Sequence, residues 1–341
     1  MSRPSARPSP TGISLTVPVA LAVLAGAGLA TQSRVNGTLA DHVGSGYLAA
    51  VISFGSGLLW LSIALLFSRR GRAGLRRIAR ALREPAGQDG GLRLWQCLGG
   101  AAGGFFVASQ GLAVGTLGVA VFIVAFVTGQ SVGSIVVDRI GLGPGGVRLV
   151  TLPRAVGPLL TVVAVATAVS GDVGSPSALA LTVLPLLAGA GSAWQQAVNG
   201  RVRAAAEDVL AATFVNFLVG TAALVLALGV SMLFDGVPHG ALPANPLLYT
   251  GGAIGIGFIA VGVAVVHRVG VLLLSLSMIA GQVVGALVLD AALPDAAPPS
   301  TLTYVGAALT LLAVAIPLTA ERRATPSRRT PEHRDDGERG T

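Results

Sequence analysis

Side-chain amides four residues apart occur twice in this sequence. Gln32 and Asn36 form one pair, and Gln195 and Asn199 form the other. Residues at this spacing share one face of a helix, and each amide carries both hydrogen-bond donors and acceptors. In a membrane such groups could bind a passing solute or tie one helix to another. The sequence leaves both interpretations of the glutamines open.

A glycine follows each asparagine of these pairs, Gly37 in the first and Gly200 in the second. Asn-Gly is typical of a helix C-terminus, where the glycine adopts a left-handed cap conformation. The asparagines are therefore either hydrogen-bonding groups for a solute or the ends of their helices, and the cap interpretation is the one we favour.

Further polar residues stand inside apolar segments. We expect Gln130 and Gln282 to line a cavity, because an amide in a lipid-facing position would be costly. Ser109, Gln110, Ser131 and Ser134 lie near them in the sequence. Ser53 and Asn216 are equally compatible with a cavity and with helix packing.

Three other residues are weaker candidates for coupling or gating. Asp138 and Asp290 close two apolar segments and could carry protons, although a carboxylate at a membrane edge is usually only solvated. Trp194 has the position of an interfacial anchor, as do Trp60 and Trp95; occlusion of a solute by ring stacking is the alternative.

The composition shows which elements must position these residues. Hydrophobic residues make up 52% of the 341 residues, charged residues 11%, and the mean hydropathy is +0.76, which predicts an integral membrane protein. Long continuous apolar runs indicate α-helices rather than barrel strands, and a spanning helix needs about 20 residues. Ten segments qualify: 14–36, 47–67, 95–114, 117–137, 154–171, 177–199, 209–233, 247–266, 269–289 and 301–320.

The two amide pairs belong to an internal repeat. The sequence LAGAGLATQSRVNG from Leu24 matches LAGAGSAWQQAVNG from Leu187 at ten of 14 positions, and GQSVGSIVVD from Gly129 matches GQVVGALVLD from Gly281. We therefore predict five-helix repeats at 14–171 and 172–320, between cytoplasmic tails at 1–13 and 321–341, the second tail disordered. Because five is odd, the second repeat enters the membrane inverted, an arrangement that allows alternating access to a midplane site.

The positions of the arginines predict the orientation. All 23 basic residues are arginine, and with a cytoplasmic N-terminus only Arg34 lies outside; this places both termini in the cytoplasm. The arginines are scattered over several loops without forming one basic face, which argues against a nucleic-acid partner. In RAGLRRIARALRE, Leu75, Ile78 and Leu82 share a helical face that suits the anionic inner leaflet; an ordinary charged loop is the alternative.

Some chemistry is excluded by what the predicted spans lack. No ionisable residue lies in the middle of any span, whereas a cation–proton exchanger typically uses a buried carboxylate and a phosphate translocator uses buried cations. We therefore expect a neutral, zwitterionic or amphipathic small solute. The single cysteine, Cys97, excludes an internal disulfide, and the four histidines lie outside the spans, so neither a metal site nor a cofactor is expected.

Three sequence elements resemble a known family: Q-x-x-x-N-G ending the first helix of each half, [SN]-F-x-x-G in the second, and G-Q-x-x-G-x-x-x-x-D in the fourth. Over residues 15–320 the chain resembles the YdcZ-like branch of the drug/metabolite transporter (DMT) superfamily, in its fused two-repeat form with an EamA-like fold. The resemblance implies ten helices as two inverted repeats, cytoplasmic termini, and export of a solute that it does not define. Thr31 opposite Trp194 and Ser53 opposite Asn216 make the halves unequal.

We therefore expect a non-enzymatic secondary transporter, an exporter of the cytoplasmic membrane that works by alternating access. Its expected partners are the lipid bilayer and a small solute. A membrane scaffold is the alternative, and it would pack Gln130 and Gln282 into a solid core. An intramembrane lipid enzyme would need paired aspartates or a Ser/His set, which the spans do not contain. The oligomeric state stays open, a homodimer included.

Overall fold

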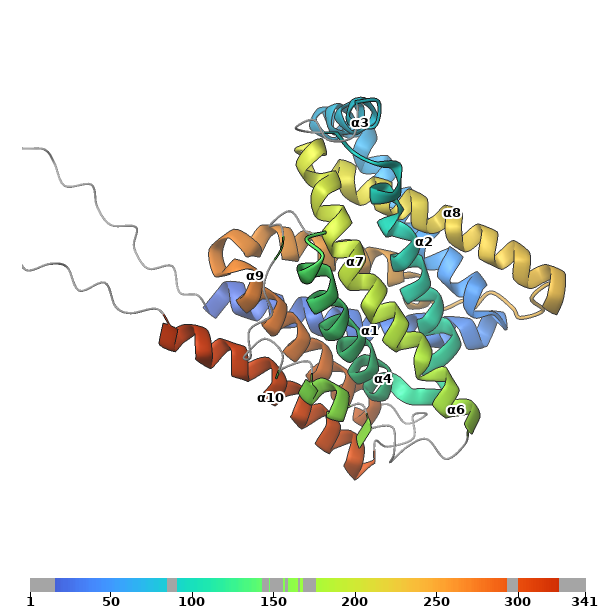
Figure 1. Ribbon diagram of the computed structural model, residues 1–341. Helices are drawn as coiled ribbons and strands as arrows, with labels where there is room; N and C mark the ends of the chain where they lie inside the picture. The colour runs from blue at the N-terminus through green and yellow to red at the C-terminus, as the bar shows by residue number, and fades with distance from the viewer. Residues whose placement is uncertain are drawn as a thin grey trace, which may run out of the picture.

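The structure is a bundle of long helices (Figure 1). The computed structural model describes residues 16–84, 91–142, 147, 156, 159–164, 166–167, 176–292 and 300–324, without the side chains of 16, 176–178, 260, 262–276 and 314–324. Within these ranges every regular element is helical. The predicted helix 154–171 and the two tails fall largely or wholly outside them.

Seven long helices, together with shorter ones, form the described part of the chain. In chain order they are α1 (Thr16–Val43), α2 (Gly46–Phe67), α3 (Arg69–Ala81), the short η1 (Leu94–Leu98), α4 (Gly99–Arg139), α6 (Pro176–Leu181), α7 (Val183–Ala206), α8 (Val209–Asp235), the short η2 (Pro246–Tyr249), α9 (Gly251–Ala292) and α10 (Thr301–Ala324). Among the described residues, three elements have the length and apolar composition to cross a membrane: α2, η1 with α4, and α8.

Two pairs of predicted spans are joined end to end. Segments 95–114 and 117–137 lie in η1 and α4, and segments 247–266 and 269–289 lie in η2 and α9. Gly118, with φ 75° and ψ 163°, interrupts the helical geometry of α4. Glycine suits this position because an L side chain disfavours a positive φ. The sequence therefore located the break of α4 within a few residues, but the helix resumes directly after it.

The cap interpretation of the Asn-Gly pairs is wrong. Gly37 lies inside α1, which continues to Val43, and Gly200 lies inside α7, which continues to Ala206. The left-handed position after α1 is Gly44, with φ 66°. A Cβ on Gly37 would lie 2.9 Å from Val114 Cγ1, so this glycine allows α1 and α4 to approach closely rather than ending a helix.

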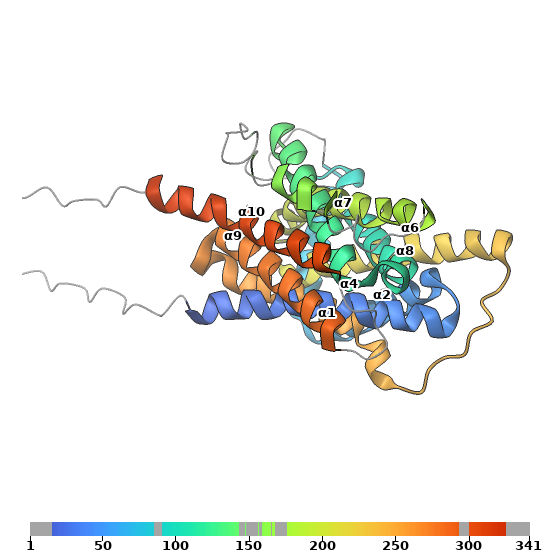
Figure 2. The same cartoon turned by 90° about the horizontal axis from the view of Figure 1, so that it is seen from below.

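Each half of the sequence repeat packs mainly on the other half. The most extensive helix contacts join α4 to α7 and α1 to α9, as Figures 1 and 2 show from two directions. Glycines sit at these contacts: a Cβ on Gly129 would clash with the backbone of Leu186, and one on Gly281 with the backbone of Val23. Small residues let helix backbones approach closely in lipid. Because Gly129 and Gly281 are repeat partners, the same contact is made twice with the halves exchanged.

The contact between α2 and α8 brings repeat partners from the two halves directly together. The rings of Phe54 and Phe217 stack with their centroids 4.8 Å apart. Phe54 lies against Gly220, and Phe217 lies against Gly57. Each phenylalanine thus occupies the space beside the glycine of the other half, and the two repeat partners meet face to face.

The helix α3 crosses the end of the bundle at which α7 ends and α8 begins. Its buried residue Ile78 packs in a cluster with Val202 and Ala206, and Leu75 and Leu82 pack against the same cluster. The helical face that the sequence suggested for a lipid surface therefore lies against protein.

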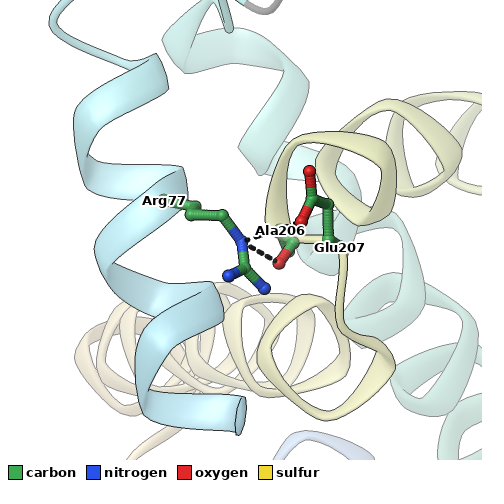
Figure 3. Close-up of polar contacts among 3 residues, drawn as sticks. All are labelled: Arg77, Ala206 and Glu207. Carbon is green, nitrogen blue, oxygen red and sulfur yellow. Dashed lines mark hydrogen bonds and ion pairs between the residues drawn. The ribbon is translucent and has the colours of Figure 1, made fainter.

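Arg77 of α3 anchors this contact. Its Nε donates a 2.7 Å hydrogen bond to the carbonyl oxygen of Ala206 and lies 3.7 Å from Glu207 Oε2 (Figure 3). The carbonyl groups of the last helical turn have no partner within their helix and carry partial negative charge. Arg77 therefore satisfies the end of α7 from the other half of the chain.

We predict that Gly100→Ala destabilises the protein by about 1–3 kcal/mol, the usual cost of overpacking. A Cβ there would lie 2.8 Å from the backbone nitrogen of Gly220 and would clash with the backbone of Asn216, neither of which can rotate away. The matched control is Gly55→Ala, because a Cβ there meets nothing within 4 Å. Thermal unfolding of the detergent-solubilised protein would measure both variants; equal stability would contradict the close approach of α4 to α8.

We predict that Arg77→Gln lowers the unfolding temperature, because the end of α7 loses a charged donor worth about 0.5–1.5 kcal/mol. Arg76→Gln removes a neighbouring, exposed arginine of the same helix and should leave the unfolding temperature unchanged. The same assay measures both. A loss in both variants would indicate that the net charge of α3, rather than the contact with Ala206, is responsible.

Candidate functional site

The two predicted amide pairs lie near the stacked rings of Phe54 and Phe217: Gly255 faces both Gln32 and Phe217, and Gly103 faces both Gln195 and Phe54. We call Gln32, Asn36 and Ser53 the α1 set, and Gln195, Asn199 and Asn216 the α7 set. The α1 set faces the start of α9, and the α7 set faces the start of α4. The structure therefore brings each predicted pair together with the predicted polar residue of the following helix.

Each set packs against glycines that are partners in the repeat alignment. A Cβ on Gly251 would lie 2.5 Å from Asn36 Oδ1, and one on its repeat partner Gly99 would lie 2.7 Å from Asn199 Oδ1. In the same way, Gly255 faces Gln32 and Gly103 faces Gln195. The amides thus contact a helix backbone that belongs to the other half.

Hydrogen bonds fix the α1 set in place. Gln32 Nε2 donates to the carbonyl oxygen of Gly251 at 2.7 Å. Asn36 Nδ2 donates to Gln110 Oε1 at 2.6 Å, and Gln110 Nε2 donates to Ser33 Oγ at 2.8 Å. These bonds join α1, α4 and α9, so the interhelical role expected for glutamine does occur at Gln32.

The side chains of the α7 set form their hydrogen bonds with one another, unlike those of the α1 set. Gln195 Nε2 and Asn199 Nδ2 both donate to Asn216 Oδ1, at 3.0 and 2.9 Å. A serine at this position could not extend as far, so the difference between Ser53 and Asn216 changes the hydrogen bonding of the two sets.

The two sets also differ in exposure. Gln32 and Asn36 are buried, Asn36 completely, whereas Gln195 and Asn199 are only half-buried. Ser53 and Asn216, one helix further on, are both buried. The helix packing is therefore tighter around the amides of α1 than around those of α7.

Gln130 and Gln282 lie at two separate helix contacts. Gln282 is 2% exposed, and its Oε1 has no hydrogen-bond partner within the described part of the chain. It lies beside Gly26 of α1, whereas Gln130, which is half-buried, lies beside Gly189 of α7. The backbone carbonyl of Gln130 accepts from Ser134 Oγ at 2.7 Å. Neither glutamine joins the hydrogen bonds of the α1 or α7 set given above.

Asp290 caps the second part of α4. Its carboxylate accepts from the backbone N–H groups of Val119 at 3.2 Å and Ala120 at 2.7 Å. These groups begin a new helical segment after the break at Gly118, and a carboxylate suits the positive end of a helix. At 4% exposure Asp290 is a buried structural group, rather than the solvated carboxylate of a membrane edge. Asp138, its repeat partner, is half-buried near the end of α4.

Trp194 packs with aliphatic residues. It is half-buried against a cluster of Val137, Ala193 and Ala197, together with Leu142. The ring does not stack on any aromatic side chain among the described residues.

The sequence did not single out Ser33 and Gln110 as site residues. Gln110 is fully buried at the α1–α4 contact, but Gly262 stands at the matching position of the second half. Ser33 likewise faces Gln196 in the repeat alignment. Because neither residue is repeated, the only available signal was a polar residue within an apolar run.

The arrangement supports reversible hydrogen bonding. Its groups are neutral amides and hydroxyls, which exchange one hydrogen-bond partner for another without forming covalent bonds. The residues that the structure describes contain no group of three or more His, Cys, Asp or Glu side chains suited to hold a metal ion.

Several apolar helices, three of them long enough to cross a membrane among the described residues, define a multi-pass membrane protein. The chain belongs to the DMT_YdcZ family, described as "Putative inner membrane exporter, YdcZ", whose model matches residues 17–167 and 180–316. The two matched ranges correspond to the two halves of the repeat.

One solved crystal structure is similar over 91% of this chain and 98% of its own, with a TM-score of 0.51 and 22% sequence identity. At this identity the similarity concerns the fold alone. No curated protein matches the chain.

We predict that Asp290→Ala lowers stability by about 1–3 kcal/mol, the cost of leaving buried donors unsatisfied, because Val119 and Ala120 lose their acceptor. Asp290→Asn retains one acceptor oxygen and should lose less. The control is Asp235→Ala, which removes an exposed carboxylate at the end of α8 that accepts from Ser231 Oγ at 2.9 Å. Thermal unfolding would measure all three; equal loss in Asp290→Ala and Asp235→Ala would argue against the cap.

Proposed function

We propose that this protein is a secondary transporter that exports a small neutral, zwitterionic or amphipathic solute by alternating access. Membership of an inner membrane exporter family supports transport in general. The mechanism is supported by one observation above all: contacts made in one half of the repeat recur in the other with the halves exchanged.

This exchange is what two inverted five-helix repeats would produce. In the proposed arrangement, residues 14–171 and 172–320 enter the membrane from opposite sides, related by an axis between Phe54 and Phe217. Halves related in this way can exchange their conformations, which gives outward-open and inward-open states of similar energy.

The unequal burial of the two amide sets suggests which state is present. Gln32 and Asn36 of the α1 set are buried, whereas Gln195 and Asn199 of the α7 set are half-buried on α7, whose C-terminal end packs against α3. With α3 and its arginines in the cytoplasm, as the positive-inside rule predicts, the buried α1 set lies toward the outside. We therefore interpret the structure as inward-facing, and exchange of the two conformations would close the α7 set and open the α1 set.

The chemistry of the sets suggests the solute class. Amides and hydroxyls bind neutral polar groups, whereas a strongly charged solute would need a buried counter-charge. In this proposal Gln32, Asn36, Gln195, Asn199, Ser53 and Asn216 contact the solute along its path, together with Gln130 and Gln282. Asp290 holds the break of α4 and need not carry a proton.

The burial of Gln282 agrees with the scaffold alternative, but the unpaired oxygens of the bundle favour a transporter. A solid core would be expected to satisfy its buried oxygens. Asn36 Oδ1, Ser53 Oγ and Gln282 Oε1 are buried and without hydrogen-bond partners among the residues that the structure describes. Acceptors of this kind are expected where a solute passes.

Cysteine accessibility tests the proposal. The variants Asn199→Cys and Asn36→Cys are both made in a Cys97→Ala background and treated with a membrane-impermeant methanethiosulfonate. Asn199→Cys should react from the cytoplasmic side about tenfold faster than Asn36→Cys reacts from either side. The reason is that Asn36 is completely buried. Asn36→Cys should react only from the outside. The control is Ala30→Cys, whose position is completely buried in α1.

Two results would contradict the proposal. Faster labelling of Asn36→Cys, or labelling of Asn199→Cys from the outside only, would reject the inward-facing interpretation. Solute flux into proteoliposomes that equals the flux into empty liposomes, across a broad metabolite panel, would reject transport itself.

A further inference from the structure

Two buried oxygen atoms in the first half point at the same glycine. Asn36 Oδ1 and Ser53 Oγ would each lie 2.5 Å from a Cβ placed on Gly251, so they are no more than about 5 Å apart. Asn36 is 0% and Ser53 1% exposed. Neither oxygen has a hydrogen-bond partner in the described ranges.

The hydrogen bonds around Asn36 determine which end of its amide faces Gly251. The carbonyl oxygen of Leu29 can only accept, so Ser33 Oγ donates to it, at 3.0 Å. Ser33 then accepts from Gln110 Nε2, which turns Gln110 Oε1 toward Asn36. Asn36 must therefore present Nδ2 to Gln110 and Oδ1 to Gly251. Reversing either amide would set two acceptors or two donors against each other.

The second half contains a hydrogen-bond acceptor that the first half lacks. There Asn216, the repeat partner of Ser53, accepts from both Gln195 and Asn199. Asn199 Nδ2 thus bonds within its own set, whereas Asn36 Nδ2 is directed away, toward Gln110. The shorter Ser53 leaves Asn36 Oδ1 as an unused acceptor, and its own hydroxyl group, which can donate or accept, has no partner in the described part of the chain.

A single small donor would satisfy both of these oxygens. Hydrogen bonds of about 2.8–3.0 Å to each of two acceptors span the separation of the two oxygens. The donor must be neutral, because the residues facing this position, Gln32, Gln110 and Gly251, carry no charge to offset a buried ammonium group. Glycine at 251 is required, since a Cβ there would lie 2.5 Å from each of the two oxygens and would displace them.

We propose that Asn36 Oδ1 and Ser53 Oγ form a subsite for a neutral N–H or O–H group, such as the primary amide or hydroxyl group of the exported solute. Ordered water occupies the subsite between transport events. The solute assignment rests on the proposed transport function, whereas binding of a neutral donor does not. The subsite belongs to the first half only, so the two halves recognise the solute differently.

The test is a structure of the full-length protein at a resolution that shows ordered water. Maps are compared without additive, with acetamide and with N,N-dimethylacetamide. Acetamide has two N–H donors, and its dimethyl derivative has none. The Ser53→Asn variant introduces the side chain that its repeat partner Asn216 has in the second half. Ser62→Asn, a change of the same kind further along α2, is the matched control.

We expect a water within hydrogen-bond distance of both oxygens without additive, and the acetamide nitrogen in its place when acetamide is present. N,N-dimethylacetamide should leave the water in position, and Ser53→Asn should remove both ligands while Ser62→Asn retains them. A direct hydrogen bond from Ser53 Oγ to Asn36 Oδ1 with nothing between them would overturn the subsite. A water that acetamide does not displace would overturn the binding of a solute group.

A transport measurement separates this inference from the proposed function. For each solute that the wild type exports, Ser53→Asn should raise KM about tenfold, and Ser62→Asn should leave KM unchanged. An unchanged KM in Ser53→Asn would overturn the solute assignment although transport stands. If the wild type exports no member of the panel, the proposed function and the solute assignment fail together, while the maps still decide whether the subsite binds a neutral donor.

Discussion

Close backbone approach between the two halves is the constraint on which the structure depends. In lipid, helices gain little by burying apolar surface, so association relies on packing and hydrogen bonds. The glycines at the α4–α7 and α1–α9 contacts permit that packing. Because each contact joins one half to the other, the polar residues of one half are positioned by the backbone of its counterpart. Gln32, for example, is held by the carbonyl group of Gly251.

The two halves share this framework but not its chemistry. The glycines at the main helix contacts and the pair Phe54 and Phe217 match in the repeat alignment, which gives both halves similar contacts. The difference lies in single polar residues, above all Ser53 and Asn216. The α7 set completes hydrogen bonds among its own side chains, whereas the α1 set leaves Asn36 Oδ1 and Ser53 Oγ without partners in the described part of the chain. Equal packing with unequal polarity permits a carrier whose two conformations are close in energy but differ in affinity for the solute.

Much of the fold was predictable from the sequence. The ranges 47–67 and 209–233 agree closely with α2 and α8, because clear capping residues and charged residues bound them. The prediction that the Asn-Gly pairs end their helices was wrong, because the sequence does not distinguish a glycine at a close helix contact from a glycine at a helix end. The bond between Asn36 and Gln110 was not predictable, since it depends on two helices meeting 74 residues apart. The cap at Asp290 likewise depends on tertiary contacts alone.

That cap has a consequence for how the chain is made. Asp290 supplies the acceptors for Val119 and Ala120, which precede it by 171 and 170 residues. During synthesis, Asp290 is added 170 residues after Ala120. The backbone N–H groups of Val119 and Ala120 therefore lack this acceptor until Asp290 has been synthesised, or they bond temporarily to water or to an insertase. The break in α4 is thus completed only near the end of synthesis, and the first half cannot mature as an independent unit.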